Sequence, residues 1–567
     1  MTGLQWWQSA VFYQIYPRSF ADGNGDGIGD LPGIIARLDY LADLGIDAIW
    51  LSPHYPSPQF DCGYDVADYS GVDPEYGTLD DFKQMLDEVH QRGMRLIIDL
   101  VLNHTSDQHS WFLESASSRE NPKRDWYIWG DGPPNDWLST FGDSAWEYDE
   151  GTGQYYYHYF FKEQPDLNWR NPEVKAAMFD AVRFWLDMGV DGYRLDAIGT
   201  VYEDPAMPAH NTGLTVAELR RRKEEAKTDA DRRAARELWD QVFGCQVNQP
   251  EVHDLMKELR TLVDEYDDRV LVGETSLIGF YGDGTDELHT VFNFPLMRLE
   301  RLTAAGIRDN QQERLSALNA LARVGWPCNT LGNHDAPRTF SRFGDGENDD
   351  ALARLSLGLV LTLRGTPFLY NGEEIGMIDL SLDDISQFRD ELGIWLYNAA
   401  RRDLGLPAEA ALQLAIDGSR DRCRTPMQWS ADANGGFCPS GVRPWLPVHP
   451  NHADGVNVAD QLNHAGSLLS YYRALLKLRR ESPALVGGDY TPLQSDDPDL
   501  LVFLRATPEQ TCLVALNFSG SAAVLEPDAA LPAAGRVLMG TPHRREGDEL
   551  ALAGLTIAPF ELLICEM

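Results

Sequence analysis

The sequence predicts a (β/α)8 barrel that carries a small inserted domain after its third strand and an antiparallel β-sandwich at its C-terminus. Three observations predict this fold: eight short apolar segments followed by turn residues, amphipathic helical patterns between several of them, and a change to closely spaced short strands after Arg480. Eight successive βα units with parallel connections favour a closed barrel. The predicted barrel strands are 11–15, 48–51, 96–101, 192–197, 270–274, 290–294, 329–335 and 365–370.

Helical patterns and insertions account for the segments between these strands. Residues 79–92, 174–188 and 252–266 have the periodicity of amphipathic helices. Residues 104–170 are rich in aromatic residues, glycine and proline and have little helical periodicity, which indicates a small inserted domain. Further insertions are expected at about 204–250 and 378–450. We expect the charged part of the first, 214–239, to form a solvated helix or helical pair, with a lid over a cleft as the alternative.

These patterns divide the chain into three predicted domains. The barrel comprises 1–103 and 171–480, the inserted domain 104–170, and the sandwich 481–567.

Composition excludes several classes of partner. The formal net charge of the 567 residues is 48 − 88 = −40, and the acidic residues are scattered along the chain. Nucleic acids and anionic membranes are therefore poor partners, and a monomer and a homodimer fit equally well. Seven widely spaced cysteines without metal-ligand spacing indicate reduced thiols. The N-terminus lacks a signal-peptide pattern and no run of about 18 apolar residues occurs, so we expect a soluble, cytoplasmic protein.

Three acidic residues stand at the ends of three predicted strands: Asp196, Glu274 and Asp335. Because a carboxylate among apolar residues costs free energy unless it is paired, these positions predict one shared polar cleft. Barrel enzymes bind substrates at the C-terminal ends of their strands, which is where the three residues lie. Strand alternation puts Arg194 on the same face as Asp196, so we expect its guanidinium group to hold that carboxylate ionised.

This cleft suits glycoside hydrolysis. A retaining glycosidase needs two carboxyl groups about 5 Å apart, one to attack the anomeric carbon and one to protonate the leaving oxygen. Asp196 suits the first role. Glu274 suits the second, because an apolar strand and a neighbouring negative charge favour its protonated form.

Four motifs resemble the characteristic regions of the α-amylase superfamily, glycoside hydrolase family 13, in order and spacing. They are DLVLNH (99–104), GYRLDA (192–197), GETS (273–276) and LGNHD (331–335). The segments QPDLNW (164–169) and SRDRCRTPMQW (419–429) are similar to segments of its oligo-1,6-glucosidase subgroup. The resemblance extends over nearly the whole chain and implies a retaining α-glucosidase.

The resemblance also implies roles for individual residues. Asp196 would be the nucleophile, Glu274 the general acid and base, and Asp335 the residue that stabilises the oxocarbenium-like transition state. An ion pair of Arg424 with Asp61 would close the far wall of a pocket for the terminal glucose, which makes the enzyme exo-acting. The other implied substrate contacts are Tyr64, His104, Phe141, Phe160, Gln164, Arg194, His334 and Arg338.

The segment DGNGDGIGD (22–30) spaces oxygen ligands two residues apart, as a loop that binds a hard cation does. It is not an EF-hand, because Gly33 stands where that motif has glutamate. The resemblance implies a structural Ca2+ or Mg2+ and no organic cofactor; a turn without metal is the alternative. The implied ligands are Asp22, Asn24, Asp26, the Ile28 carbonyl and Asp30.

Two departures from the family bear on the substrate. Ala197 stands where relatives restricted to α-1,6 bonds typically have valine and those restricted to α-1,4 bonds threonine, so we expect a broad or α-1,4-tolerant enzyme for maltose, isomaltose or sucrose-type oligosaccharides. The segment RLERL (298–302) matches the RLDRD segment of sucrose isomerases only in part, which favours hydrolysis over isomerisation. A sucrose isomerase or glucosyltransferase remains the alternative. A non-catalytic binding protein is disfavoured, because all three acids are present.

Overall fold

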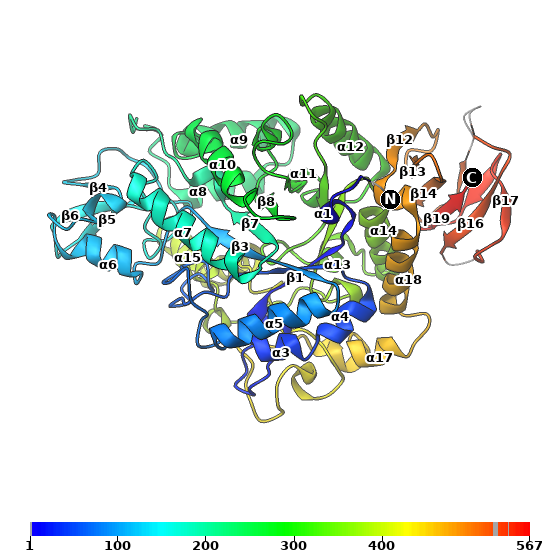
Figure 1. Cartoon of the computed structure of the whole chain (residues 1–567), viewed down its shortest axis with the longest axis horizontal. Helices are drawn as coiled ribbons and strands as arrows, with labels where there is room; N and C mark the ends of the chain where they lie inside the picture. The colour runs from blue at the N-terminus through cyan, green and yellow to red at the C-terminus, as the bar shows by residue number, and fades with distance from the viewer. Residues whose placement is uncertain (1–2, 526–530, 542–543) are drawn as a thin grey trace.

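The computed structural model describes residues 3–525, 531–541 and 544–567 (Figure 1). At its centre is a sheet of eight parallel strands in the order β10-β11-β1-β2-β3-β7-β8-β9. A parallel bridge between Phe292 and Cys328 joins its two edges, so the sheet closes into the predicted barrel. The strands are β1 (Phe12–Ile15), β2 (Ala48–Leu51), β3 (Arg95–Val101), β7 (Gly192–Asp196), β8 (Val270–Gly273), β9 (Thr290–Val291), β10 (Cys328–Thr330) and β11 (Thr366–Tyr370).

Each of the eight predicted strands is present, but β9 and β10 are shorter than expected. The chain leaves β9 early because the Asn293 side chain accepts the Leu296 N–H and so caps a helix that begins at Phe294. Close packing of strands is visible at Gly192, where φ is +147° and an added Cβ would lie 2.1 Å from the Val270 carbonyl oxygen. Only glycine fits there, and it keeps β7 tight against β8.

Helices cover the outside of the barrel. In α5 (Leu79–Gln91), Thr78 and Asp81 form a capping box, and the side chains at Phe82, Met85 and Val89 are buried against the sheet. Each such side chain contributes about 1.5–3 kcal/mol when fully buried. The other long helices of this layer are α4 (Leu38–Leu44), α7 (Pro172–Met188), α10 (Glu251–Val263), α12 (Ala304–Asn319), α14 (Asp349–Thr362) and α18 (Leu468–Glu481). Short helices are α1 (Trp6–Ser9), α2 (Pro17–Phe20), α3 (Leu31–Ile35), α11 (Phe294–Met297), α13 (Thr339–Phe343), α17 (Val458–Leu462) and α19 (Pro483–Gly487).

The segment after β3 forms a helix and a three-stranded antiparallel sheet in the order β4-β6-β5, at the opposite end of the molecule from the C-terminal sheets (Figure 1). These elements are α6 (Ser110–Ser117), β4 (Trp129–Gly130), β5 (Trp146–Asp149) and β6 (Gln154–Tyr157). The insertion expected at about 378–450 contains α15 (Glu391–Arg402) and α16 (Ala408–Gly418).

The charged segment 214–239 contributes to two helices, α8 (Val216–Glu225) and α9 (Asp229–Phe243). This is the predicted helical pair. It is not solvated on all sides. Val216 and Leu219 of α8 share a buried cluster with Trp137 and Tyr159 of the inserted segment. The pair is therefore packed against that segment by an apolar face that its high charge conceals in the sequence.

The C-terminal strands form a six-stranded sheet in the order β12-β13-β14-β19-β16-β17 and a two-stranded ladder, β15-β18. Side chains from both share one core, among them Val502, Leu513 and Ile557, which confirms the predicted sandwich. The strands are β12 (Asp489–Leu493), β13 (Leu500–Ala506), β14 (Thr511–Asn517), β15 (Ala523–Leu525), β16 (Ala534–Gly540), β17 (Glu549–Ala551), β18 (Leu555–Ile557) and β19 (Leu562–Glu566).

We retain the three domain boundaries as a proposal. Residues 526–530 and 542–543 of the proposed sandwich and residues 1–2 of the barrel segment lie outside the described residues. Among the helices of the described residues, none has both the length and the apolar character needed to cross a membrane.

Candidate active site

The three predicted acids meet at the C-terminal end of the barrel. Asp196 is the last residue of β7, Glu274 follows β8, and Asp335 follows β10 after a short turn. All three line a pocket of about 350 Å³. The single shared cleft that the sequence predicts is therefore present.

Arg194 holds two of these acids together. Its Nη1 lies 2.7 Å from Asp196 Oδ1 and its Nη2 lies 2.8 Å from Glu274 Oε2. The same guanidinium group also pairs with Asp99, and it is 1% exposed. Because one planar group binds both carboxylates, the two are kept a few ångströms apart in fixed orientations. This is the compact arrangement that a retaining mechanism requires.

The single guanidinium group of Arg194 pairs with three carboxyl groups, those of Asp99, Asp196 and Glu274. Burial raises the pKa of Asp196 well above its ordinary value; Arg194 opposes this shift, whereas Glu274 and Asp99 reinforce it. Burial also raises the pKa of Asp99 to about 6, again against the effect of Arg194. The expectation that Arg194 simply holds Asp196 ionised is therefore incomplete. A cluster of this kind retains a shared proton to higher pH than isolated carboxyl groups do, as an acid and base pair needs.

The surroundings of Glu274 differ from the expected apolar setting. In addition to the contact with Arg194, its Oε2 accepts a 2.8 Å hydrogen bond from the Ala197 N–H. Ala197 has left-handed backbone angles, φ 41° and ψ 38°, which are unfavourable for a residue with a Cβ. This turn at the end of β7 directs the N–H group to Glu274, so the backbone strain has a visible use.

Asp335 lies among positive charges. Its Oδ1 is 2.6 Å from Arg424 Nη2 and 3.8 Å from Arg420 Nη1. Burial raises the pKa of Asp335, but the adjacent His334 and the two guanidinium groups outweigh it and hold the pKa well below the ordinary range. His334 is fully buried, and burial lowers its pKa well below the ordinary value, so we assign a neutral imidazole and attribute the ionisation of Asp335 to the two arginines.

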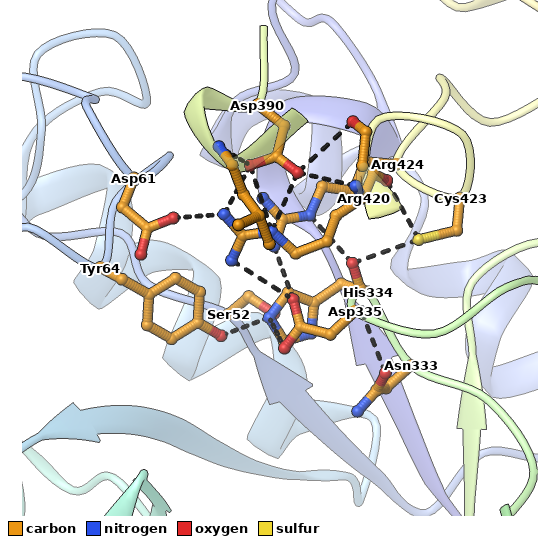
Figure 2. Close-up of polar contacts among 12 residues, drawn as sticks. Ser52, Asp61, Tyr64, Asn333, His334, Asp335, Asp390, Arg420, Cys423 and Arg424 are labelled. Carbon is orange, nitrogen blue, oxygen red and sulfur yellow. Dashed lines mark hydrogen bonds and ion pairs between the residues drawn. The ribbon is translucent and has the colours of Figure 1, made fainter. Parts of the chain in front are cut away.

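The predicted ion pair of Arg424 with Asp61 is wrong. Asp61 pairs with Arg420, whose Nη2 lies 2.6 Å from Asp61 Oδ1 and 2.6 Å from Asp390 Oδ1 (Figure 2). Arg420 and Arg424 lie in one turn, in which the Arg424 N–H donates to the Arg420 carbonyl over 3.2 Å. Both side chains therefore enter the pocket region, but at different depths. Arg424 is the deeper one; its Nε donates to the His334 carbonyl over 2.9 Å. Sequence reasoning missed Arg420 and Asp390, and the only local signal of Asp390 is its place before α15, which its side chain caps.

Most other predicted contacts are gathered in the site. Tyr64, His104, Phe141 and Phe160 line the pocket. Gln164 is buried behind it and donates from Nε2 to Asp61 Oδ2 over 3.1 Å. Burial lowers the pKa of His104 to about 3, so this side chain is neutral.

Two predicted contacts lie behind the pocket surface. His334 Nε2 is 2.6 Å from the Tyr64 hydroxyl and 3.4 Å from Asp335 Oδ2. Arg338 is not brought to the pocket: it is 1% exposed and donates from Nη1 to the Asn371 carbonyl over 2.9 Å. Its guanidinium group lies 5.0 Å from the ring centroid of Tyr370, an environment that indicates a packing role.

A second pocket of about 360 Å³ adjoins the first on the other side of Glu274 and Asp335. Phe294 and Arg298 line both pockets, and neither was predicted as a contact. Glu274 and Asp335 line both spaces as well, so the two pockets share these residues.

The predicted cation loop has oxygen groups of the right kind, but they are engaged with the loop's own backbone. Asp22 accepts the Gly27 N–H over 2.8 Å, Asp26 accepts the Ile28 N–H over 2.8 Å, and Asp30 accepts the Asn24 N–H over 3.0 Å. Within the described ranges no three histidine, cysteine, aspartate or glutamate side chains are grouped as metal ligands. The donor types, three carboxylates with an amide and a backbone carbonyl, fit Ca2+ or Mg2+.

Comparison with known proteins agrees with this geometry. Residues 14–488 match the model of the alpha amylase catalytic domain. The chain belongs to the α-amylase family. This confirms the resemblance to glycoside hydrolase family 13, and with it a glycoside hydrolase.

Relatives lie within the predicted subgroup. An oligo-1,6-glucosidase of Halalkalibacterium halodurans is 40% identical over 91% of both chains. A probable alpha-glucosidase of Rhizobium meliloti is 40% identical over 92% of this chain and 91% of its own length. Among solved structures, a mutant of the trehalulose synthase MutB with Tris has a TM-score of 0.88 at 36% identity over 100% of both chains. An isomaltulose synthase mutant of Erwinia rhapontici with sucrose has a TM-score of 0.86 at 37% identity, again over 100% of both.

Proposed function

We propose that this protein is a retaining, exo-acting α-glucosidase that releases glucose from the non-reducing end of short α-glucosides. The observation that carries the proposal is the arrangement of Asp196 and Glu274 on one guanidinium group, opposite the positively surrounded Asp335. The oligo-1,6-glucosidase and alpha-glucosidase names of the relatives support it.

The reaction proceeds in two displacements. In the first, a carboxylate oxygen of Asp196 attacks the anomeric carbon, the glycosidic bond breaks, and the carboxyl proton of Glu274 passes to the leaving oxygen. In the second, water attacks the same carbon while the Glu274 carboxylate takes its proton, and the glucosyl ester of Asp196 breaks. Each displacement inverts the anomeric centre, so the product keeps the α configuration. Ionised Asp335 binds sugar hydroxyls and stabilises the positive charge that develops on the ring.

The exo action follows from the far wall of the pocket. Arg420, Asp61 and Asp390 form a closed ionic cluster there, with side chains between 1% and 11% exposed. A longer chain would have to displace these buried charges in order to extend past the wall, which is costly. The terminal glucose is therefore the residue that the pocket accepts.

Substrate breadth is expected to depend on Ala197, whose small side chain lines the pocket beside the site of attack. It leaves room for both α-1,4 and α-1,6 linked leaving groups, and for sucrose. The alternative is a sucrose isomerase or glucosyltransferase, since a trehalulose synthase and an isomaltulose synthase are among the similar structures. The partial match of 298–302 to the isomerase segment favours hydrolysis.

Three further features belong to this proposal. A structural Ca2+ or Mg2+ would be held by the loop through Asp22, Asn24, Asp26, Ile28 and Asp30, as its oxygen donors favour. A cytoplasmic location is supported by seven free cysteines. The assembly would be a monomer or a homodimer.

The proposed activity is tested by incubating the protein with maltose, isomaltose, sucrose and trehalose and following products by proton NMR. We expect free α-glucose from the non-reducing end as the first product. Formation of a new disaccharide without free glucose would instead establish the isomerase or transferase, and no conversion of any of the four sugars by folded protein would refute the proposal.

A further inference from the structure

One wall of the active-site pocket is a loop that also borders a second cavity. Thr140 and Phe141 line the pocket, yet Phe141 also lines a separate cavity of about 410 Å³ on its other side. Phe60 and Trp395, both only half-buried, line that cavity as well. The Phe141 ring packs against Phe160 and Phe161, with centroids 5.3 and 5.0 Å apart, and borders the cavity on part of its surface. The position of this wall therefore depends on the contacts of its backbone as well as on these ring contacts.

Two arginines from other insertions contribute to those contacts. Arg220 of α8 donates from Nη2 to the Thr140 carbonyl over 2.9 Å. Arg402 of α15 pairs through Nη2 with Asp143 Oδ1 over 2.7 Å. Both arginines reach the same short loop from elements distant in sequence.

The contact from Arg220 is the stronger of the two. Its Nε is buried and has no hydrogen-bond partner among the described residues, so the Thr140 carbonyl is the group that this guanidinium group serves. Arg220 is partly buried, and burial lowers its pKa to about 10. The Arg402 pair, in contrast, has side chains that are 53% and 55% exposed, and such pairs contribute little.

The helix that carries Arg220, α8, is itself held by buried contacts. Val216 and Leu219 of the same helix are buried in a cluster with Trp137 and Tyr159 of the inserted segment. The Thr140 N–H donates to the Tyr159 carbonyl over 2.8 Å, so the loop and the helix rest on the same residue.

We propose that Arg220 is a positioning residue that holds the Thr140–Phe141 wall against the bound sugar, so that the charged helical pair sets substrate affinity without touching substrate. The inference rests on the proposed function, because it assumes that sugar binds in this pocket. The helical pair is then a fixed outer support of the wall. Without Arg220, Phe141 moves back into the cavity behind it and the pocket widens.

The test compares Arg220→Met, which keeps the apolar stem, with Arg221→Met, which removes an exposed charge from the next position of the same helix. With p-nitrophenyl α-glucopyranoside and maltose, we expect Arg220→Met to raise KM about tenfold and leave kcat within about twofold, since a charge-assisted hydrogen bond is lost. Arg220→Lys, which retains a donor, should restore most of the affinity. Arg221→Met should match the parent.

Amide hydrogen exchange supplies a readout that does not depend on activity. We expect faster exchange in peptides covering 139–144 for Arg220→Met alone, even if the parent hydrolyses none of the sugars. Unchanged KM and unchanged exchange in Arg220→Met would overturn the proposal, as would an equal effect of Arg221→Met. Should Arg220→Met fail to fold, Arg220→Gln decides it, because the shorter side chain no longer reaches the Thr140 carbonyl, and parental values of both KM and exchange in that variant would contradict a wall held by Arg220.

Discussion

Arg420 pairs with Asp61 across 359 residues of sequence, with Nη2 2.6 Å from Oδ1, and so closes the far end of the active-site pocket. The neighbouring Arg424, which the sequence predicts as the partner, lies deeper and pairs with Asp335. The two arginines therefore have different main partners: Arg420 pairs with Asp61 at the far end of the pocket, and Arg424 pairs most closely with Asp335.

This division predicts the outcome of double-mutant cycles. For Asp61→Asn combined with Arg420→Gln we expect a coupling of about 1–3 kcal/mol in kcat/KM, because the two groups are in direct contact. Asp61→Asn combined with Arg422→Gln is the matched control, since Arg422 faces Asp379 instead. The kinetics are measured with maltose. Additive effects of the Asp61 and Arg420 substitutions would show that the pair does not shape the site.

A larger side chain at Ala197 is predicted to change the linkage preference. Valine at this position would narrow the space beside the leaving group, so Ala197→Val should raise the ratio of kcat/KM for isomaltose over maltose at least severalfold. It should also lower stability by about 1–2 kcal/mol, because a β-branched side chain tolerates the left-handed conformation poorly. Ala197→Gly is the control and should leave the ratio unchanged. Equal ratios in all three proteins would remove Ala197 from the specificity argument.

Buried histidines predict a loss of stability in acid. His54 is fully buried, both its ring nitrogens lack hydrogen-bond partners in the described part of the chain, and burial lowers its pKa to about 3. The folded state therefore binds a proton less readily than the unfolded state, whose histidine pKa is about 6.5. The stabilising effect of the neutral ring is complete above pH 6.5 and is lost progressively as the pH falls from there toward 3.

The substitution His54→Leu removes this pH-dependent contribution to stability. We expect the loss of unfolding free energy between pH 7 and pH 5 to be about 2 kcal/mol smaller in the variant than in the parent, measured by urea denaturation. His464→Leu, at an exposed position, serves as the control and should follow the parent. Identical losses in His54→Leu and the parent would show that His54 is protonated in the folded protein.

The cation loop predicts an effect of chelation on stability and not on chemistry. Ca2+ at 100 times its dissociation constant should stabilise the parent by about 2.7 kcal/mol, seen as a rise in Tm over protein treated with EDTA. Asp26→Ala should abolish the rise. Asp345→Ala is the control, because Asp345 also accepts backbone N–H groups in an exposed loop. A parent Tm that is insensitive to Ca2+ and Mg2+ would favour the metal-free turn.

Much of this molecule is predictable from the sequence because its core is periodic. Each barrel strand appears as a short apolar run, and alternation within β7 predicts that Arg194 lies beside Asp196, as the structure confirms. Local patterns of this kind report which face of a strand a residue occupies, and for the three acids proposed to be catalytic that is sufficient.

The errors share a different physical origin. The choice between Arg420 and Arg424 depends on how a late insertion packs against a loop near the N-terminus, which no local pattern encodes. The setting of Glu274 depends on the left-handed turn at Ala197, a conformation that its side chain does not favour. Arg338 was predicted to contact substrate, but its side chain points to the Asn371 carbonyl and not into the pocket.

The central claim is that Asp196 forms a covalent bond with glucose, and trapping tests it most directly. The parent is incubated with 5-fluoro-α-D-glucosyl fluoride, digested with a protease and mapped by mass spectrometry. The account predicts one fluoroglucosyl group per chain, attached to Asp196, and none in Asp196→Asn. A glucosyl adduct on Glu274 or Asp335, or turnover of maltose by Asp196→Asn at the parental rate, would contradict it.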